Sequence, residues 1–263
     1  MTETISSVLQ GLIQGLTEYL PVSSSGHLSI FQNLTGTGAP DLLYDLTLHL
    51  ATVCATLVYF GKDIVKLLIE FFKGFRPSPL PKDEGWYFGW AVIFGSIPTA
   101  VIGLLLEPAV KGASSSMIYI GVALIVTAMI LWVLSYIPQG NRKICISIGL
   151  IVGVAQGVAV FPGISRSGMT LAAALICGLK ADEAFRFSFL LALPAICGAS
   201  LLEFLKAGTS NAVLPAGWGI GAACAFLSGL AALYLLHRTV VRGQWKVFSI
   251  YCAAVGLLAL VVL

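Results

Sequence analysis

Two short polar stretches in an otherwise apolar chain carry the residue types that could do chemistry. The first, EYLPVSSSGHL, runs from Glu18 to Leu28 and holds a carboxylate, three serines, a proline, a glycine and a histidine. The second, VFPGISRSGMT, runs from Val160 to Thr170 and contains Arg166. Both interrupt apolar segments, where non-helical backbone and polar groups are expected only if protein or a wet cavity satisfies them.

Each stretch is predicted to end one helix and begin another. Pro21 and the Pro162-Gly163 pair would break the first helix, and the serines that follow are good N-cap residues for the second. Two helix N-termini would then meet near the middle of the layer, each with free N–H groups and the positive end of its dipole. Such an arrangement is an anion site, and phosphate is its usual ligand.

The side chains of both motifs suit the same ligand. Arg166 is the one arginine deep within an apolar region, and its planar fork matches phosphate oxygens. An unpaired arginine there would cost roughly 2.5–3.5 kcal/mol on insertion scales, which favours a functional role. The serines could equally be helix caps or anion ligands. The candidate phosphate-binding residues are Ser23, Ser25, Gly26, Ser165, Ser167, Gly168 and Thr170.

Glu18 and Gln14 are one helical turn apart and therefore share a helix face. A carboxylate opposes an anion site unless a divalent cation lies between the two, and Mg²⁺ or Ca²⁺ bridges carboxylates to phosphate through oxygen ligands. Glu18 and Gln14 are therefore candidate metal ligands. The alternative is an ion pair between Glu18 and Arg166 without a metal. Under either interpretation Glu18 is a functional residue.

Ser24 and His27 are three residues apart at the start of a predicted helix, which puts them on one face. A hydroxyl beside an imidazole can be a nucleophile with its general base, or the imidazole can be the acid for the leaving group. Two routes stay open: attack by Ser24, which we favour, and attack by a water held by Glu18 or its metal. His49, four residues after Asp45 on the first full span, is expected to line the cavity.

The composition indicates the class of protein. Of the 263 residues, 58% are hydrophobic and only 10% are charged, whereas a soluble domain carries about a quarter charged residues. The mean hydropathy is +0.95, which predicts a polytopic integral membrane protein. The net charge of +3, without a polybasic tail, argues against nucleic acid as a partner.

The apolar segments predict an all-α membrane protein with six full spans and two re-entrant helical hairpins. A span needs about 20 residues, with a range of about 17–25. Four other segments are short or interrupted and form two pairs, each joined through one polar motif, which suggests re-entrant hairpins. The predicted spans are 44–61, 86–106, 117–137, 183–205, 213–237 and 245–263, and the pairs are 5–20 with 22–34 and 144–160 with 166–179.

The two halves of the chain, about 1–140 and 141–263, look alike. QGLTEYLPVSSSGH at 14–27 aligns without gaps to QGVAVFPGISRSGM at 156–169. Each half would hold one hairpin and three spans. Because three crossings is an odd number, the second half would begin from the opposite face, which is an inverted-topology repeat within a single membrane domain.

The basic residues predict the orientation. Lys111 and Lys206 fall on the face of the termini, Arg166 lies inside its motif, and the twelve other lysines and arginines fall on the opposite face. The positive-inside rule makes the richer face cytoplasmic, so both termini and the entry of the first hairpin are expected outside. The twelve are Lys62, Lys66, Lys73, Arg76, Lys82, Arg142, Lys143, Lys180, Arg186, Arg238, Arg242 and Lys246.

Together the motifs resemble the two signature motifs of bacterial undecaprenyl-pyrophosphate phosphatases of the bacitracin-resistance type. The resemblance runs the whole length and includes FRFSFLLALPA at 185–195. Gln14 stands where many relatives carry glutamate, so a metal there would have one charged ligand fewer. In that family, the residues that match Glu18, Ser24, His27 and Arg166 are tied to catalysis.

The resemblance implies a substrate and a place in the cell. The substrate would be a polyprenyl pyrophosphate in the outer leaflet, hydrolysed to the monophosphate carrier and inorganic phosphate, so that the carrier is recycled for peptidoglycan. The location would be the bacterial plasma (inner) membrane, with the active site open to the outer face. The competing function is a transporter that flips the polyprenyl phosphate, since broken helices in inverted repeats are a transporter architecture. Ser24 with His27 favours an enzyme, and the oligomeric state is left open, with a homodimer as one option.

Overall fold

The chain forms a bundle of helices in a computed structural model. The structure describes residues 2–36, 42–77, 79–113, 116–207 and 214–262. Within these ranges the regular elements are helices, apart from one isolated bridge between Arg142 and Leu179. The predicted all-α class is confirmed. In chain order the helices are α1 Glu3–Tyr19, α2 Ser24–Thr35, α3 Leu42–Tyr59, α4 Gly61–Lys73, α5 Glu84–Ala113, α6 Met117–Leu134, α7 Ile146–Val158, α8 Arg166–Ile176, α9 Ala181–Ala207, α10 Trp218–Val241 and α11 Trp245–Val262.

Four of these helices, α5, α6, α9 and α10, are long and apolar enough to cross a membrane. The apolar parts of α3 and α11, Leu43–Tyr59 and Trp245–Val261, are shorter. They fall near the lower end of the length that a span needs. Four of the six predicted spans therefore coincide with helices that are long and apolar enough to cross a membrane, and all six crossings stay predictions.

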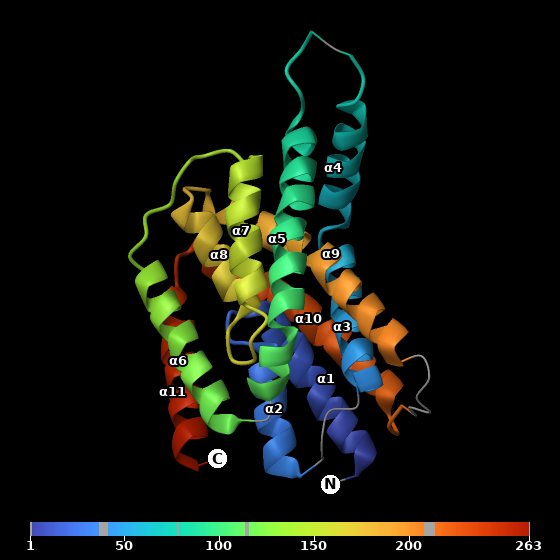
Figure 1. Cartoon of the computed structure of the whole chain (residues 1–263), viewed down its shortest axis with the longest axis vertical. Coiled ribbons are helices and arrows are strands. Elements are labelled where there is room, and N and C mark those ends of the chain that lie inside the picture. Colours follow the sequence, from blue (N-terminus) through green and yellow to red (C-terminus); the bar gives the residue numbers. More distant parts are fainter. Residues whose placement is uncertain (1, 37–41, 78, 114–115, 208–213, 263) are drawn as a thin grey trace.

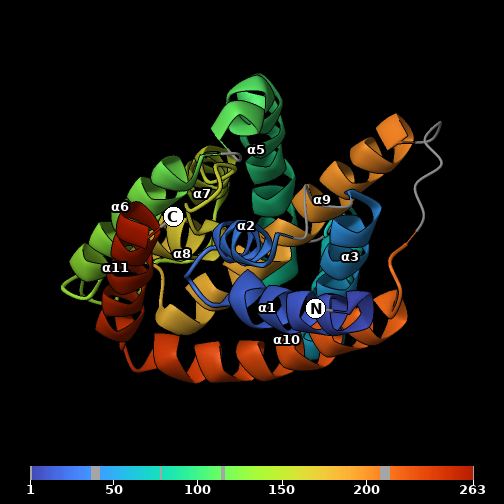
Figure 2. The ribbon, with the colours of Figure 1, turned by 90° about the horizontal axis from the view of Figure 1, so that it is seen from below.

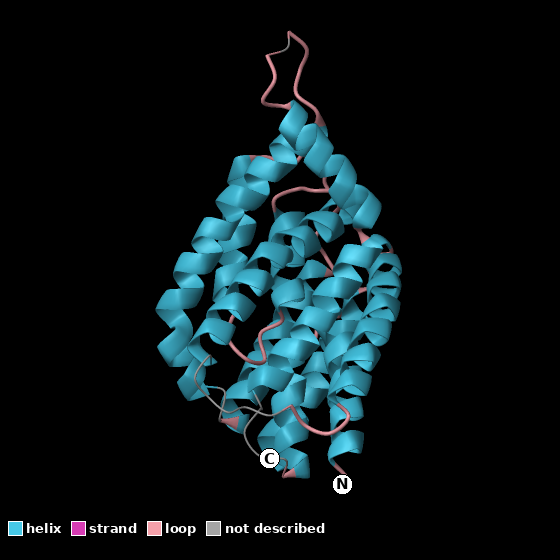
Figure 3. Cartoon of the chain, turned by 90° about the vertical axis from the view of Figure 1, so that its right-hand side faces the viewer, coloured by secondary structure: helices cyan, strands magenta, loops and turns pink. Residues whose placement is uncertain are grey.

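The short helices form two hairpins that enter the bundle from opposite ends (Figure 1). The first, α1 with α2, enters and returns at the end where the first turn of α1 and the last turn of α11 lie. The second, α7 with α8, enters and returns at the other end. There the N–H of Arg142, before α7, donates to the carbonyl of Gly178, after α8, at 2.8 Å. The tips of both hairpins consequently reach the middle of the bundle, and Figure 3 shows loops lying between the helices at that level.

Helices of the two halves of the chain pack against each other in corresponding pairs. α1 lies along α10, α7 lies along α5, and α6 lies along α11, and Figure 2 shows the first and third pairs side by side. A Cβ on Gly11 of α1 would lie 2.7 Å from the carbonyl carbon of Gly221, and one on Gly153 of α7 would lie 2.7 Å from that of Gly95. Glycine at these positions lets the backbones approach closely, as helices do inside membranes.

An aromatic cluster anchors the tip of the first hairpin to the core. The ring of Phe185 on α9 lies 4.9 Å from that of Phe189 and 5.5 Å from that of Phe60, between centroids. Tyr19, the last residue of α1, lies 5.7 Å from Phe189, and its hydroxyl donates to the carbonyl of Thr52 on α3. Aromatic pairs of this kind contribute about 0.5–1.5 kcal/mol each beyond their buried area.

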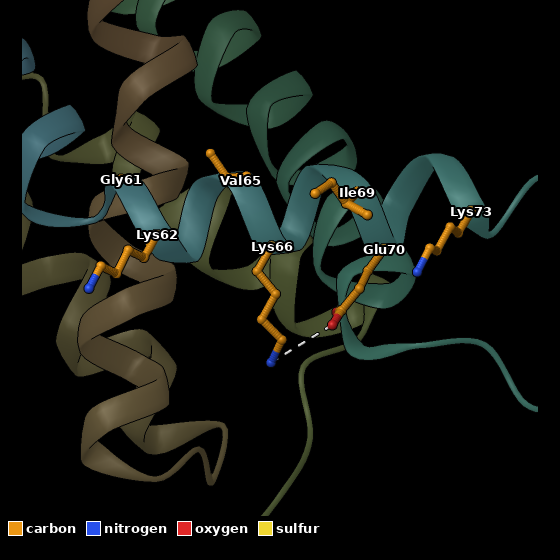
Figure 4. A pocket seen from close by; sticks show the side chains of 7 residues that line it. All are labelled: Gly61, Lys62, Val65, Lys66, Ile69, Glu70 and Lys73. Atoms are coloured by element: carbon orange, nitrogen blue, oxygen red, sulfur yellow. Dashed lines mark ion pairs between the residues drawn. The ribbon is translucent and has the colours of Figure 1, made fainter.

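Helix α4 is an element that the sequence analysis missed, because its charged residues were assigned only to a cytoplasmic connection between spans. It lies along the start of α5, and the two extend beyond the rest of the bundle (Figure 1). A hollow of about 620 Å³ lies along α4, and its lining includes Lys62, Lys66 and Lys73. The Nζ of Lys66 lies 3.8 Å from a carboxylate oxygen of Glu70 (Figure 4). No residue of either polar motif lines this hollow, so it is separate from the site described next.

Candidate active site

The first motif turns the chain between α1 and α2 at Ser23. With a φ of 70°, Ser23 is the one non-glycine residue of positive φ within the described ranges. A left-handed conformation costs about 1–3 kcal/mol at such a residue and persists only where the surroundings enforce it. The Ser23 hydroxyl accepts a hydrogen bond from the N–H of Gly26 at 3.4 Å, so this serine is the N-cap of α2.

The second motif turns the chain between α7 and α8. Gly163 has a φ of 92°, a conformation that favours glycine. Ser165 is the N-cap of α8, since its hydroxyl accepts from the N–H of Gly168 at 3.1 Å. Thr127 of α6 holds the turn in place: its hydroxyl accepts from the N–H of Ser165 at 3.1 Å and donates to the carbonyl of Gly163 at 2.9 Å.

The two turns contact each other, so the N-termini of α2 and α8 lie side by side. The N–H of Gly163 donates to the hydroxyl of Ser23 at 3.0 Å, and the hydroxyl of Ser167 donates to the carbonyl of Leu20 at 3.2 Å. A Cβ on Gly26 would lie 3.1 Å from the Cα of Gly163. Helix geometry leaves the first N–H groups of each helix without intrahelical acceptors, and the cap serine occupies only one of them.

Glu18 is the centre of the polar network between the hairpins. Its side chain is 3% exposed, and its Oε1 pairs with the guanidinium of Arg166. Its Oε2 accepts hydrogen bonds from the hydroxyl of Ser24 at 2.7 Å and from the amide of Gln14 at 3.1 Å. Nε2 of His49 lies 3.9 Å from the same oxygen. Predicted site residues from α1, α2, α3 and α8 thus converge on one carboxylate.

The ion pair explains how a carboxylate can lie beside an anion site. Burying a carboxylate is unfavourable unless it is paired and hydrogen-bonded. Arg166 supplies the opposite charge, and Ser24 and Gln14 supply hydrogen bonds. The structure thus contains the ion pair between Glu18 and Arg166 that the sequence left as an alternative. The Arg166 side chain is 26% exposed, so a ligand can reach it.

The ring of His27 is hydrogen-bonded to Ser23 and Tyr251 and not to Ser24, contrary to the pairing expected from the sequence. Its Nδ1 lies 2.8 Å from the carbonyl oxygen of Ser23, and its Nε2 lies 2.9 Å from the hydroxyl of Tyr251 on α11. The spacing of three residues does place Ser24 and His27 on one helix face, but the imidazole is directed back to the carbonyl four residues before it. Glu18 is therefore the base within hydrogen-bond reach of Ser24.

The other hydroxyl groups differ in what they offer a ligand. Ser25 is exposed, and its oxygen lies 3.4 Å from that of Ser23. Ser167 is buried and engaged with the first hairpin. Thr170 is also buried, and its hydroxyl donates to the carbonyl of Arg166 within α8 at 3.0 Å. In this conformation Ser25 is the predicted phosphate-binding hydroxyl that is most accessible.

A divalent cation at this place would meet one unpartnered protein oxygen, that of Gln14, beside the already engaged carboxylate of Glu18. Oε1 of Gln14 is buried without a hydrogen-bond partner, while the amide nitrogen of the same side chain is bonded to Glu18. Among the described residues, no group of three or more histidines, cysteines, aspartates and glutamates could hold a metal ion. Gln14 and Glu18 fit a cation only if water or phosphate oxygens complete its shell, as is usual for Mg²⁺.

Comparison with known proteins identifies the family. Residues 7–258, which include both hairpin tips, match the family of the bacitracin resistance protein BacA. The chain belongs to the BacA family. A relative from Desulforapulum autotrophicum, named undecaprenyl-diphosphatase, is 38% identical over 98% of each chain. Relatives of the same name from Desulfosudis oleivorans and Korarchaeum cryptofilum are 40% and 36% identical over 97% of this chain and 96% and 97% of their own.

Membership of the BacA family, together with the apolar helices, makes this chain a multi-pass membrane protein. Two residues that shape its site escaped the sequence analysis because they lie on helices far from either motif. For Thr127 on α6, the one indication of a role in the site is a hydroxyl group within an apolar predicted span. Tyr251 on α11 had no signal, since a tyrosine in a span usually needs no explanation.

Proposed function

We propose that this BacA-family protein hydrolyses undecaprenyl diphosphate to undecaprenyl phosphate and inorganic phosphate. Its relatives at 36–40% identity over nearly the whole chain are named for that activity. The reaction would return the lipid carrier to peptidoglycan synthesis. The protein would be an enzyme of the bacterial inner membrane, with the headgroup of its substrate in the polar site and the prenyl tail left in the bilayer.

The observation that carries the proposal is the position of Arg166. It is the first residue of α8, pairs with Glu18 of the other hairpin, and lies where two helix N-termini meet. A diphosphate would find a planar guanidinium, unoccupied N–H groups and the positive ends of two helix dipoles together. We infer that the terminal phosphate competes with Glu18 for Arg166, which would free the carboxylate as a base when substrate binds.

We propose that Ser24 is the nucleophile and that Glu18 accepts its proton. The bond from Ser24 Oγ to the terminal phosphorus forms, the bond from that phosphorus to the bridging oxygen breaks, and the electron pair leaves with undecaprenyl phosphate. Water then attacks the phosphoserine and contributes its oxygen and protons to the phosphate. The serine oxygen leaves with the proton held by Glu18. The first-turn N–H groups would stabilise the charge that develops on the phosphoryl oxygens.

The alternative route has water as the nucleophile, with Ser24 only donating a hydrogen bond. Both routes need Glu18, so its loss does not separate them. The distance of 2.7 Å between Ser24 and Glu18 favours the serine, because an activated hydroxyl requires a base within this reach. His27 and His49 would then act on the substrate or its leaving group, and Ser23, Ser25, Gly26, Ser165, Ser167, Gly168 and Thr170 would shape or line the phosphate site.

A divalent cation, Mg²⁺ or Ca²⁺, would be held by Gln14 and Glu18. The unpartnered Oε1 of Gln14 supports this assignment, and the scarcity of protein ligands favours a cation that arrives with the diphosphate. When bound, it would neutralise phosphate charge. Gln14 and Glu18 would orient it from the face of α1 that they share.

We also propose the membrane topology that the sequence predicted: an inverted repeat of halves 1–140 and 141–263, with six spans and two re-entrant hairpins. The corresponding packing of α1 on α10 and of α7 on α5 supports it. Hairpins that enter from opposite ends support it as well (Figure 1). The end that carries both terminal helices would face the periplasm, so the first hairpin and the active site would open outward.

Purified protein in detergent tests the proposed function directly. Inorganic phosphate should be released from undecaprenyl diphosphate, and much more slowly from undecaprenyl phosphate. The same preparation in liposomes should be assayed for movement of the monophosphate lipid between leaflets. Robust lipid flipping without phosphate release would reject hydrolysis and identify a transporter of the carrier.

A further inference from the structure

Tyr251 lies on α11, outside both hairpins and α3, and contacts the predicted catalytic side chain of His27. Its ring is stacked on the imidazole of His27, with the centroids 5.6 Å apart and the planes inclined by 5°. Its hydroxyl lies 2.9 Å from Nε2 of His27. One side chain therefore fixes both the plane of the imidazole and the partner of one nitrogen.

The other nitrogen of His27 decides which way that hydrogen bond runs. Nδ1 lies 2.8 Å from the carbonyl oxygen of Ser23, and a carbonyl can only accept. The proton of a neutral His27 must therefore be on Nδ1, and Nε2 carries the lone pair. The hydroxyl of Tyr251 consequently donates to Nε2. The pair of contacts selects one tautomer out of two.

The carbonyl that receives Nδ1–H belongs to the strained turn of the first motif. Ser23 has a φ of 70°, and its carbonyl also accepts from the backbone N–H of His27 at 3.2 Å. Its hydroxyl is bonded to Gly163 of the second hairpin. The chain of contacts from Tyr251 through His27 to Ser23 thus ends at the point where the hairpins meet.

Because Nδ1 is held by the carbonyl of Ser23, Nε2 is the ring nitrogen of His27 that can exchange a proton with a substrate, once a substrate oxygen takes the place of the Tyr251 hydroxyl. We propose that Tyr251 is a positioning residue of the hydrolytic site, which holds the imidazole of His27 in the plane and tautomer that direct this nitrogen to the substrate. The proposal rests on the hydrolytic function proposed above. Tyr251 itself is placed in no bond-making step, and it acts through His27.

Two substitutions separate the contributions of the hydroxyl and the ring. Tyr251→Phe keeps the stacked ring but removes the donor, and it should lower kcat on the order of 10-fold with KM little changed, because a misdirected catalytic group loses rate rather than binding. Tyr251→Leu also removes the stack and should cost on the order of 10²-fold. Tyr87→Phe on α5, at a tyrosine that is similarly exposed (48% against 44%), is the matched control and should leave turnover unchanged.

A double variant tests whether Tyr251 acts through His27. If it does, Tyr251→Phe should have no further effect on turnover in a His27→Asn background, since residues in contact are not additive. Additive losses would show an independent or merely structural role. Thermal unfolding of each variant controls for folding.

A spectroscopic measurement completes the test without needing turnover. In protein labelled with ¹⁵N-histidine, His27, identified by comparison with His27→Asn, should give the signature of the Nδ1–H tautomer. Tyr251→Phe should shift this signal or broaden it by tautomer exchange, whereas Tyr87→Phe should not. An unchanged His27 signal together with wild-type kcat in Tyr251→Phe would overturn the proposal. A wild-type protein that releases no phosphate would reject the proposed function, while the signal would still show whether Tyr251 positions His27.

Discussion

Glu18 and Arg166 are 148 residues apart in the chain and form an ion pair where the tips of two opposed hairpins meet. Ser24 donates to the second oxygen of the same carboxylate at 2.7 Å. One buried carboxylate thus links the only deeply placed arginine of the motifs to the candidate nucleophile. Removing either charged partner leaves the other without its counter-ion, so the choice of substitution matters in every test of this site.

Replacement of Arg166 by lysine should abolish most turnover while the protein still folds. Lysine keeps the positive charge beside Glu18 but loses the planar fork that binds two phosphate oxygens. The expected loss is on the order of 10²–10³ in rate, as for removal of a donor that stabilises a transition state. Arg186→Lys is the matched control, because Arg186 pairs with Glu84 and both residues lie outside the two hairpins. Normal turnover of Arg166→Lys would make Arg166 a general counter-ion.

Glu18→Gln and His27→Asn should differ in the step that they impair. Glu18 is within hydrogen-bond reach of Ser24 and His27 is not bonded to it, so Glu18→Gln should slow formation of a phosphoenzyme by about 10²–10⁴-fold. His27→Asn should still form the intermediate and lose about 10²-fold in steady-state rate, the lower end of what a general acid or base contributes. Pre-steady-state bursts of undecaprenyl phosphate, the product that leaves when the phosphoenzyme forms, compare the two variants. A burst that survives in Glu18→Gln and disappears in His27→Asn would restore the pairing of Ser24 with His27.

The helix breaks and caps of this site can be predicted from the sequence, whereas the side-chain partners cannot. Two helix breaks and two helix N-caps could be predicted, because the residue types involved have strong local preferences. These residues are Pro21, the Pro162-Gly163 pair and the serines after them. The partner of Ser24 could not be predicted in the same way. A spacing of three puts His27 on the correct face, but the imidazole is taken by a backbone carbonyl and by Tyr251.

The fold shows the same division between local and tertiary information. Hydropathy predicted the position of every apolar helix, whereas α4 was missed although Val65, Leu68, Ile69 and Phe72 recur at helical spacing. The lysines of this segment were assigned to a connection, and the apolar spacing between them was not interpreted. The contact of Tyr251 with His27 depends on how α11 lies against the rest of the bundle, and no local pattern encodes that.

Close packing of α7 on α5 should make Gly153 intolerant of a methyl group. A Cβ there would lie 2.7 Å from the carbonyl carbon of Gly95, so Gly153→Ala should lower the free energy of unfolding by about 1–3 kcal/mol through overpacking. Gly198→Ala in α9 is the control, because a Cβ there meets nothing within 4 Å. The control should be neutral or slightly stabilising, since alanine is the better helix former. Thermal unfolding in detergent gives both values, and equal effects would contradict the packing.

Reporter fusions should place both termini in the periplasm. The prediction follows from the twelve basic residues expected on one face and from the position of α1 and α11 at the same end of the bundle (Figure 1). A reporter that is active only in the periplasm should be active when fused to either terminus and inactive when inserted between α4 and α5. Termini on different sides of the membrane would contradict the predicted topology. They would indicate that one of the two short apolar helices, α3 or α11, does not cross the membrane.

Trapping of a phosphoenzyme is the measurement that tests the central claim, attack by Ser24 at the meeting point of the hairpins, most directly. Undecaprenyl diphosphate labelled at its terminal phosphate should be mixed with the protein, quenched with acid within milliseconds, and the label located by peptide mapping. We predict label on Ser24, and neither label nor turnover in Ser24→Ala. If the parent protein turns over with no trapped label and Ser24→Ala keeps a few per cent of its activity, water is the nucleophile and the assignment of Ser24 is wrong.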